Sequence, residues 1–177
     1  MGLGVSGNFM TDLTNTLDDI REIFSILHDG TTSTWTGDRN LLSLKIDSEW
    51  LAERIDKSFK SFYIECGQIE KIEFHPWMNP STLPQTLLTE IDDIFKASLE
   101  ILSADIESDF VKIICNQHNT DFDYCGGALL LNCTSIKIFD QDKRKITLDH
   151  FNSICKSYWD DFSKEIEQSI IDKNNRS

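Results

Sequence analysis

The residues best suited to chemistry lie together in one polar segment, residues 116–127. The segment joins two very apolar stretches that predict buried strands, and functional side chains favour loops on such rigid scaffolds. His118, Asp121 and Asp123 are metal-ligand types, but their spacing does not complete a calcium loop or another metal motif. We therefore predict no metal and no cofactor. The segment, with Tyr124 included, is a candidate binding site, and the alternative is a solvated loop.

A cysteine nucleophile is the second chemical possibility in this segment. Cys125 would need His118 as its base, and the amides of Gly126 and Gly127 could form an oxyanion hole. The sequence around Cys125 has no signature of a cysteine hydrolase family. Phosphate-binding glycine loops and the H-E-x-x-H and G-x-S-x-G motifs are also missing from the sequence. We therefore expect no active site, and a small hydrolase or a metal- or ligand-binding protein at residues 116–127 is the alternative.

Charge is the strongest signal in the composition. The chain has 17 Lys and Arg against 30 Asp and Glu, a formal net charge of -13. Because each phosphate contact needs a cation, this balance argues against nucleic acid and anionic membranes as partners. It favours a basic protein partner, although surplus carboxylates also serve solubility. Asp160 and Asp161 belong to the acidic cluster nearest the C-terminus, and we predict that they bind this partner.

Two tryptophans lie where they could recognise a partner. Trp35 lies in the Thr- and Ser-rich residues 30–40, which predict a loop, so we expect an exposed side chain and a binding role. Trp77 follows Pro76, which predicts the end of a strand. Large aromatic side chains are usually buried, so we expect Trp77 in the core. A recognition surface around Trp77 is the alternative.

The cysteines and the opening residues indicate a compartment. The five cysteines show no C-x-x-C spacing, and four lie in or beside apolar segments, which is typical of buried thiols in a reducing environment. The first residues lack the basic and long apolar parts of a signal peptide, and no apolar run reaches about 18 residues. We therefore expect a cytoplasmic protein.

Hydrophobic periodicity predicts a helix near each end of the chain. Residues 10–27 carry one apolar stripe, with Gly30 as a C-cap. A helix of about six turns should follow Thr147 as its N-cap. Its apolar stripe consists of Leu148, Phe151, Ile154, Cys155, Tyr158, Phe162, Ile166 and Ile170. Both stripes need an apolar surface to cover them, and a sheet face is the obvious one.

The middle of the chain reads mainly as strands. Residues 48–55 are ambiguous and favour a short helix over an extension of the strand before them, and residues 81–95 predict another short helix. Cys66, Gly67 and Gln68 predict the turn of a hairpin, because Gly67 can take a positive φ. The predicted strands are residues 42–46, 59–65, 69–74, 98–107, 109–117, 128–133 and 135–139.

The predicted architecture is therefore α+β, with an antiparallel sheet of about six or seven strands packed with N-terminal and C-terminal amphipathic helices. Residues 1–177 should form one domain, with frayed ends at about residues 1–8 and 172–177.

In overall profile, as a small acidic α+β chain without a catalytic motif, the sequence is similar to the immunity proteins that neutralise bacterial toxins. The resemblance assigns no residues. It implies a non-enzymatic, acidic protein-binding module whose partner is a basic toxin, since close charge pairs give large coupling energies. A structural subunit or adaptor of a larger assembly is a further alternative, and it predicts an exposed apolar patch.

Overall fold

The computed structural model describes residues 16–174. The elements follow one another as α1 (Thr16–Ile26), β1 (Thr31–Gly37), β2 (Leu41–Asp47), α2 (Glu49–Ala52), β3 (Ser61–Met78), α3 (Ile91–Phe95), β4 (Glu100–Glu107), β5 (Phe110–Asn116), β6 (Tyr124–Phe139), β7 (Lys145–Ile146) and α4 (Leu148–Asn174). The predicted start of the first helix lies outside the described residues, as do the predicted frayed ends apart from residues 172–174, which are helical.

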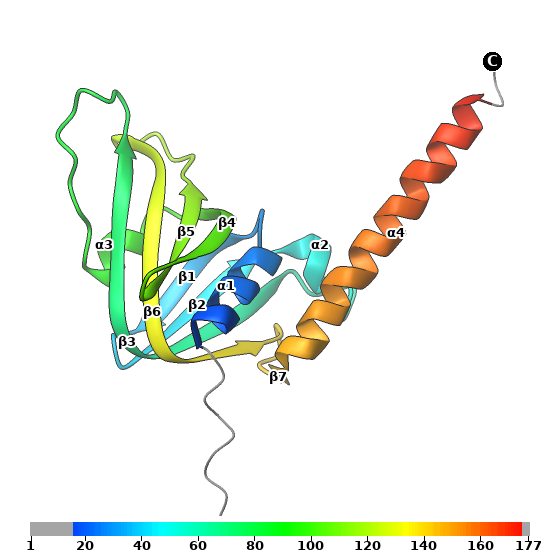
Figure 1. The fold of residues 1–177 in the computed structure, drawn as a ribbon, viewed down its shortest axis with the longest axis horizontal. Helices are drawn as coiled ribbons and strands as arrows, with labels where there is room; N and C mark the ends of the chain where they lie inside the picture. Colours follow the sequence, from blue (N-terminus) through cyan, green and yellow to red (C-terminus); the bar gives the residue numbers. More distant parts are fainter. Residues whose placement is uncertain (1–15, 175–177) are drawn as a thin grey trace, which may run out of the picture.

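The sheet is antiparallel and curls until its first and last long strands meet (Figure 1). Its order is β3-β2-β1-β4-β5-β6-β7, and β3 pairs additionally with β6, so six strands form a ring. The two sides of the ring differ. Pairing between β3 and β6 extends from Tyr63 opposite Phe139 to Met78 opposite Tyr124, whereas β1 and β4 share the single pair of Thr31 and Glu100. The predicted fold class is confirmed.

The core lies inside this curved sheet and is closed by α1. Alternate residues of β2 and β5 point inward, as their alternating sequence predicts. Helix α1 packs against β4, β5 and β6, and Phe24 is 1% exposed. Burying each such side chain stabilises the fold by roughly 1.5–3 kcal/mol. The fully buried side chains of this core include Ile20, Leu27, Leu42, Leu44, Ile46, Ile64, Val111 and Ile113.

The predicted hairpin turn at residues 66–68 is wrong, because β3 runs through it. Gly67 pairs with Leu41 on one side and Ser135 on the other, and a Cβ at Gly67 would lie 2.5 Å from the Ser135 hydroxyl oxygen. The positive φ of 50° belongs instead to Gln68, and the register between β3 and β6 shifts just after it, between Ile69 and Lys71. The glycine thus permits a close approach of strands, and the extra residue is a bulge.

Two further predictions around the end of β3 are wrong. The strand continues past Pro76, which pairs with Gly127 beside another register shift. It ends before Pro80, which follows a cis peptide bond. Of the predicted helix over residues 81–95, α3 alone forms, because Leu88 makes two backbone hydrogen bonds to Phe74 and keeps this stretch extended.

The predicted loop over residues 30–40 is also wrong for most of its length. Thr31–Gly37 forms β1, which pairs with β2. Its threonines are β-branched and favour strand geometry, so the polar composition was misleading. The predicted short helix after Asp47 is confirmed as α2. The two apolar strands that the sequence predicts on either side of residues 116–127, β5 and β6, pair with each other.

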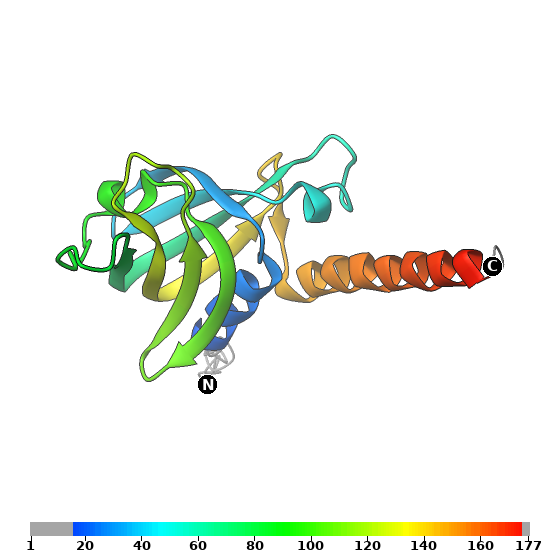
Figure 2. The ribbon, with the colours of Figure 1, turned by 90° about the horizontal axis from the view of Figure 1, so that it is seen from above.

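Helix α4 begins as predicted and then leaves the rest of the molecule. The His150 amide donates to the Thr147 hydroxyl at 3.2 Å, which caps the helix. The first turns contact α1 and α2, and Phe151 packs against Phe62 of β3 at 5.1 Å between ring centroids. The remainder of α4 projects away from the sheet (Figure 2). The prediction that the sheet covers the whole stripe is therefore wrong. None of the described helices combines the length and apolar character needed to cross a membrane.

Candidate functional site

The segment 116–127 is a loop between β5 and β6 that is stabilised by its own side chains. The Gln117 side-chain amide donates to the Tyr124 carbonyl at 2.8 Å, and the Gln117 amide donates to the Cys125 carbonyl at 2.9 Å. Asn119 accepts a hydrogen bond from the Asp121 amide at 2.9 Å, which is an Asx turn. Much of the polarity that made this segment conspicuous therefore serves the loop's own conformation.

The three predicted ligand-type side chains of this loop point to different surroundings. His118 Nε2 lies 2.8 Å from a carboxylate oxygen of Glu100 on β4. Asp121 and Asp123 are exposed, and the Asp123 backbone carbonyl accepts from the Asn79 amide at 2.8 Å. Within residues 16–174, no three His, Cys, Asp or Glu side chains gather closely enough to hold a metal ion.

Cys125 and His118 have separate partners on opposite sides of the β5–β6 pair. The Cys125 thiol donates to the Trp77 carbonyl at 3.6 Å, on the β3 side, whereas His118 contacts Glu100 on the β4 side. Strand β3 borders β6, and β4 borders β5. Because a nucleophile needs its base within hydrogen-bond distance, this arrangement gives Cys125 no activation by His118.

Gly126 and Gly127 serve strand packing. Both are paired with β5, and a Cβ on Gly127 would lie 2.4 Å from the His75 carbonyl oxygen. A side chain at either position would force the strands apart, so glycine is explained by close backbone approach.

Tyr124 is a core residue. Its ring centroid lies 5.8 Å from that of Phe74 and 5.4 Å from that of Phe122, and 8% of its surface is exposed. Burial raises the pKa of the Tyr124 phenol, and the nearby Asp93 carboxylate acts in the same direction. Tyr124 therefore contributes packing and presents little surface to a partner.

The two tryptophans reverse their predicted environments. Trp35 lies on β1, half-buried against Phe95, and its indole N–H donates to the Asp92 carboxylate at 2.7 Å. Trp77 is 44% exposed near the end of β3. The expectations of an exposed Trp35 and a buried Trp77 are both wrong, because residues 30–40 form a strand and the helix that was to cover Trp77 does not form.

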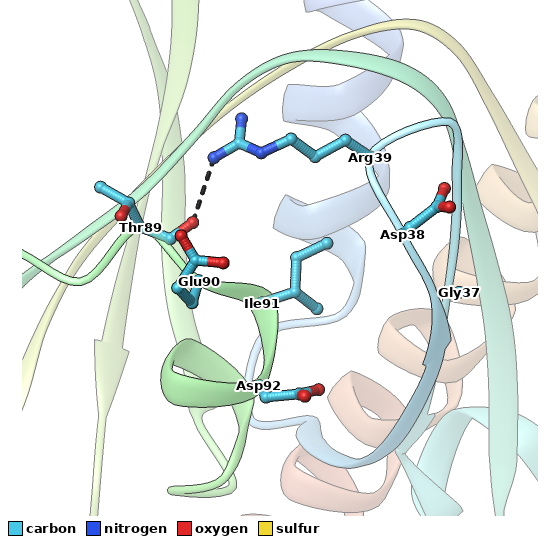
Figure 3. A pocket seen from close by; sticks show the side chains of 7 residues that line it. All are labelled: Gly37, Asp38, Arg39, Thr89, Glu90, Ile91 and Asp92. Carbon is cyan, nitrogen blue, oxygen red and sulfur yellow. Dashed lines mark hydrogen bonds between the residues drawn. The ribbon is translucent and has the colours of Figure 1, made fainter.

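A recess of about 250 Å³ lies between the β1–β2 turn and the segment that leads into α3 (Figure 3). Arg39 reaches across it and donates to the Thr89 carbonyl at 3.0 Å. Two of its three carboxylates already have structural partners. Asp38 accepts from two backbone amides, of Asn40 and Leu41, which lower its pKa, and Asp92 accepts from Trp35. The recess therefore leaves few polar groups without a hydrogen-bond partner that a ligand could bind.

Asp160 and Asp161 lie on α4, far from the loop in Figure 1. Asp160 contacts Lys156 at 2.6 Å, within the helix. Asp161 contacts Arg54, next to α2, at 2.6 Å, and this hydrogen bond lowers the pKa of the Asp161 carboxyl. The predicted binding residues thus divide into two groups, since Trp35 and the loop lie beside α3 and the two aspartates lie on α4.

An aromatic junction of four rings joins α4 to the rest of the molecule. Trp50 lies 4.5 Å from Tyr158 and 5.4 Å from His28 between ring centroids, and His28 stacks on Trp159 at 5.7 Å. Aromatic pairs at such separations are each worth about 0.5–1.5 kcal/mol beyond area burial. This junction, together with Arg54 and Asp161, marks where α4 leaves the body.

From Trp159 of the junction outward, α4 exposes an apolar stripe that the sequence predicts to be covered. We call Trp159, Phe162, Ile166 and Ile170 the α4 stripe; their exposed fractions are 41%, 42%, 44% and 53%. Three of the four belong to the predicted periodic pattern. The pattern identified the face correctly, but periodicity alone does not tell which surface covers it.

Comparison with known proteins gives no match to a family model, a curated protein or a solved structure.

Proposed function

We propose that this protein is a non-enzymatic, acidic binding module whose partner is a basic protein. Its most specific form is an immunity-type inhibitor that neutralises a basic bacterial toxin in the cytoplasm. The observation that carries the proposal is the acidic surface. The net charge is -13, and Asp140 is the one carboxylate among residues 16–174 whose side chain is buried. The remaining described carboxylates are at least partly exposed.

An acidic surface of this kind acts first on association. Its field attracts a basic protein over a distance of about one Debye length, ~10 Å at moderate salt, and disfavours nucleic acid and anionic lipid. Close charge pairs then contribute to affinity and suppress the wrong partners. The surface thus supplies fast and selective encounter, which an inhibitor of a damaging enzyme requires.

The loop at residues 116–127 supports binding over catalysis. His118 and Cys125 contact Glu100 and Trp77, respectively, and do not contact each other. The loop's exposed carboxylates, Asp121 and Asp123, add to the acidic surface at that end.

The cysteines support a reducing compartment. All five are free, and Cys66, Cys115 and Cys133 are buried. Burial raises the pKa of the Cys115 thiol to about 12, so this group is neutral and inert at physiological pH.

A second candidate function is favoured by the α4 stripe, namely a subunit or adaptor of a larger assembly. Exposed apolar residues in a contiguous row are typical of interaction sites. The two candidates differ in salt dependence, since a mainly apolar assembly contact is less sensitive to ionic strength than a charge-driven complex.

A pull-down with the tagged protein at low and at high salt, followed by mass spectrometry and reconstitution from purified components, tests the proposal. We expect one stoichiometric basic partner whose binding weakens as salt rises. A neutral or acidic partner retained at high salt would favour the assembly subunit. The absence of a partner at either salt would contradict both functions.

A further inference from the structure

The projecting part of α4 lacks the packing that normally stabilises a helix. It extends roughly 15 Å from Phe162 to Asp172, at about 1.5 Å per residue. In both views it points away from the sheet (Figures 1 and 2). Isolated helices of this length are marginal in water. Among its described side chains, Ile166 and Ile170 are each about half exposed, at 44% and 53%.

Carboxylates border the α4 stripe on both sides. Successive helical residues are about 100° apart, so Glu165 and Glu167 lie on opposite flanks of Ile166. Within the described part of the chain, neither glutamate has an ion-pair partner within 4.0 Å. Between Trp159 and Asp172 the sequence has five carboxylates and one lysine. Asp160 and Asp161 are paired with Lys156 and Arg54, so the surface is an apolar row with one unpaired glutamate on each flank.

The charges decide between two possible occupants. A second copy of the chain would bring like charges together. Antiparallel pairing centred on Ile166 places each glutamate beside its equivalent, and parallel pairing places Glu165 of one copy beside Glu167 of the other. A segment with cations on both sides of its apolar face would instead make opposite-charge contacts along both edges, as flanking charges do in paired helices.

We propose that the α4 stripe is the docking surface for an amphipathic helix with Lys or Arg on both sides of its apolar face. This inference rests on the proposed function, because it takes the basic partner from there and adds the surface and the secondary structure that are recognised. The partner's apolar residues pack between Phe162 and Ile170, and its cations reach Glu165 and Glu167.

Two neighbouring isoleucines provide a matched control. Ile170 and Ile171 have almost the same exposure, 53% and 51%. Ile170 belongs to the stripe, whereas Ile171 lies about 140° around the helix from Ile166. Substituting either one by serine removes the same apolar surface from the same turn. An effect confined to Ile170→Ser therefore reports the stripe and not general hydrophobicity or helix stability.

The test uses the full chain and a synthetic peptide of about 20 Leu and Lys residues, with Leu at helical spacing. A peptide of the same composition with scrambled Leu positions measures nonspecific attraction. By calorimetry at low salt, we expect the patterned peptide to bind at least about tenfold more tightly than the scrambled one. We expect Ile170→Ser to weaken it about tenfold and Ile171→Ser less than twofold.

The flanking charges are tested with a second variant that leaves the stripe intact. We expect the double substitution Glu165→Gln with Glu167→Gln to weaken the patterned peptide about tenfold and to reduce its salt dependence. Because these side chains are exposed, the variant keeps the fold. An unchanged affinity would overturn the assignment of the acidic edges.

Three further results would overturn the inference. Equal binding to wild type and Ile170→Ser, or no preference for the patterned peptide, would place the basic partner elsewhere on the surface and leave the proposed function intact. A wild-type dimer in sedimentation velocity that Ile166→Ser dissociates would make a second copy the occupant. Failure of the proposed function is separate, since it requires that the pull-down returns no basic partner at all.

Discussion

The two halves of α4 carry the same apolar periodicity in very different surroundings. In the first half, Phe151 is 0% and Ile154 7% exposed, whereas Phe162 and Ile170 in the second half are 42% and 53% exposed. One helix thus contains a segment stabilised by a core and a segment that offers the same kind of face to solvent. The comparison teaches that an amphipathic stripe indicates a covered face without specifying that the cover belongs to the same chain.

The two halves also differ in what stabilises the helix. The first half is fixed by packing and by the Thr147 cap. The second relies on local contacts such as Lys164 with Asp161 at 3.6 Å and Gln168 with Asp172 at 2.9 Å. Each contact of this type is worth about 0.2–0.5 kcal/mol. The second half should therefore unfold locally much more easily than the first.

The largest expected difference comes from truncating one apolar residue in each half. Phe151→Ala should lower the free energy of unfolding by about 3–5 kcal/mol, because it leaves a cavity in a fully buried site. Ile166→Ala should change it by no more than about 0.5 kcal/mol, because its side chain is already largely in water. Urea denaturation of both variants measures the contrast. Similar losses would show that the second half packs on the body in solution.

The aromatic junction should hold α4 against the rest of the protein and so slow its local unfolding. Trp50→Ala removes ring contacts with His28 and Tyr158 and should cost about 2 kcal/mol. We expect faster amide hydrogen exchange from Tyr158 onward, with unchanged protection in β2. Trp77→Ala serves as the control, since this exposed tryptophan lies elsewhere on β3. Unchanged exchange in α4 would mean that the junction does not anchor it.

Acid should loosen the same junction through Asp161. The Arg54 hydrogen bond lowers the pKa of this carboxyl in the folded protein, so its contribution is present above the ordinary aspartate pKa. The contribution is lost as the pH falls through the lowered value. We expect amide chemical shifts around Asp161 to follow this titration, and Arg54→Gln to move its midpoint upward. A midpoint identical in the two proteins would exclude the contact in solution.

The smallest effect concerns intrinsic helix propensity. Ser169→Ala should stabilise the second half by about 0.5 kcal/mol and raise the helical signal in circular dichroism. Ser153→Ala, in the packed half, should leave that signal unchanged, because tertiary contacts already keep this part helical. An equal change of the helical signal in the two variants would show that the two halves of α4 do not differ in local stability.

Much of the fold could be predicted because side-chain alternation is a local property. Residues 42–46 and 110–115 indicated strands, and the stripe after Thr147 indicated a helix, and all three are confirmed. The continuity of β3 could not be predicted from Gly67 and Gln68. A bulge and a hairpin turn have the same local composition, and the choice depends on pairing with the distant residue Ser135.

The candidate site was harder to predict because exposure depends on tertiary neighbours. Trp35 is covered by α3, and Trp77 loses its expected cover because residues 81–90 are not helical. His118 and Cys125 are close in sequence, yet β5 and β6 direct them to different strands. The sequence predicts that the stripe residues of α4 share one face. Whether that face is exposed depends on how far along α4 the rest of the protein extends, which the sequence does not give.

The long pairing between β3 and β6 also bears on how the chain folds. The β4–β5 hairpin is local and can form early, but β3 finds β6 only after the intervening segment has been synthesised and brought back. Until then the 18 residues of β3 have a free edge toward the missing β6. Such an edge is a template for wrong pairing with other chains. The nascent protein is thus most vulnerable to aggregation between the emergence of β3 and that of β6.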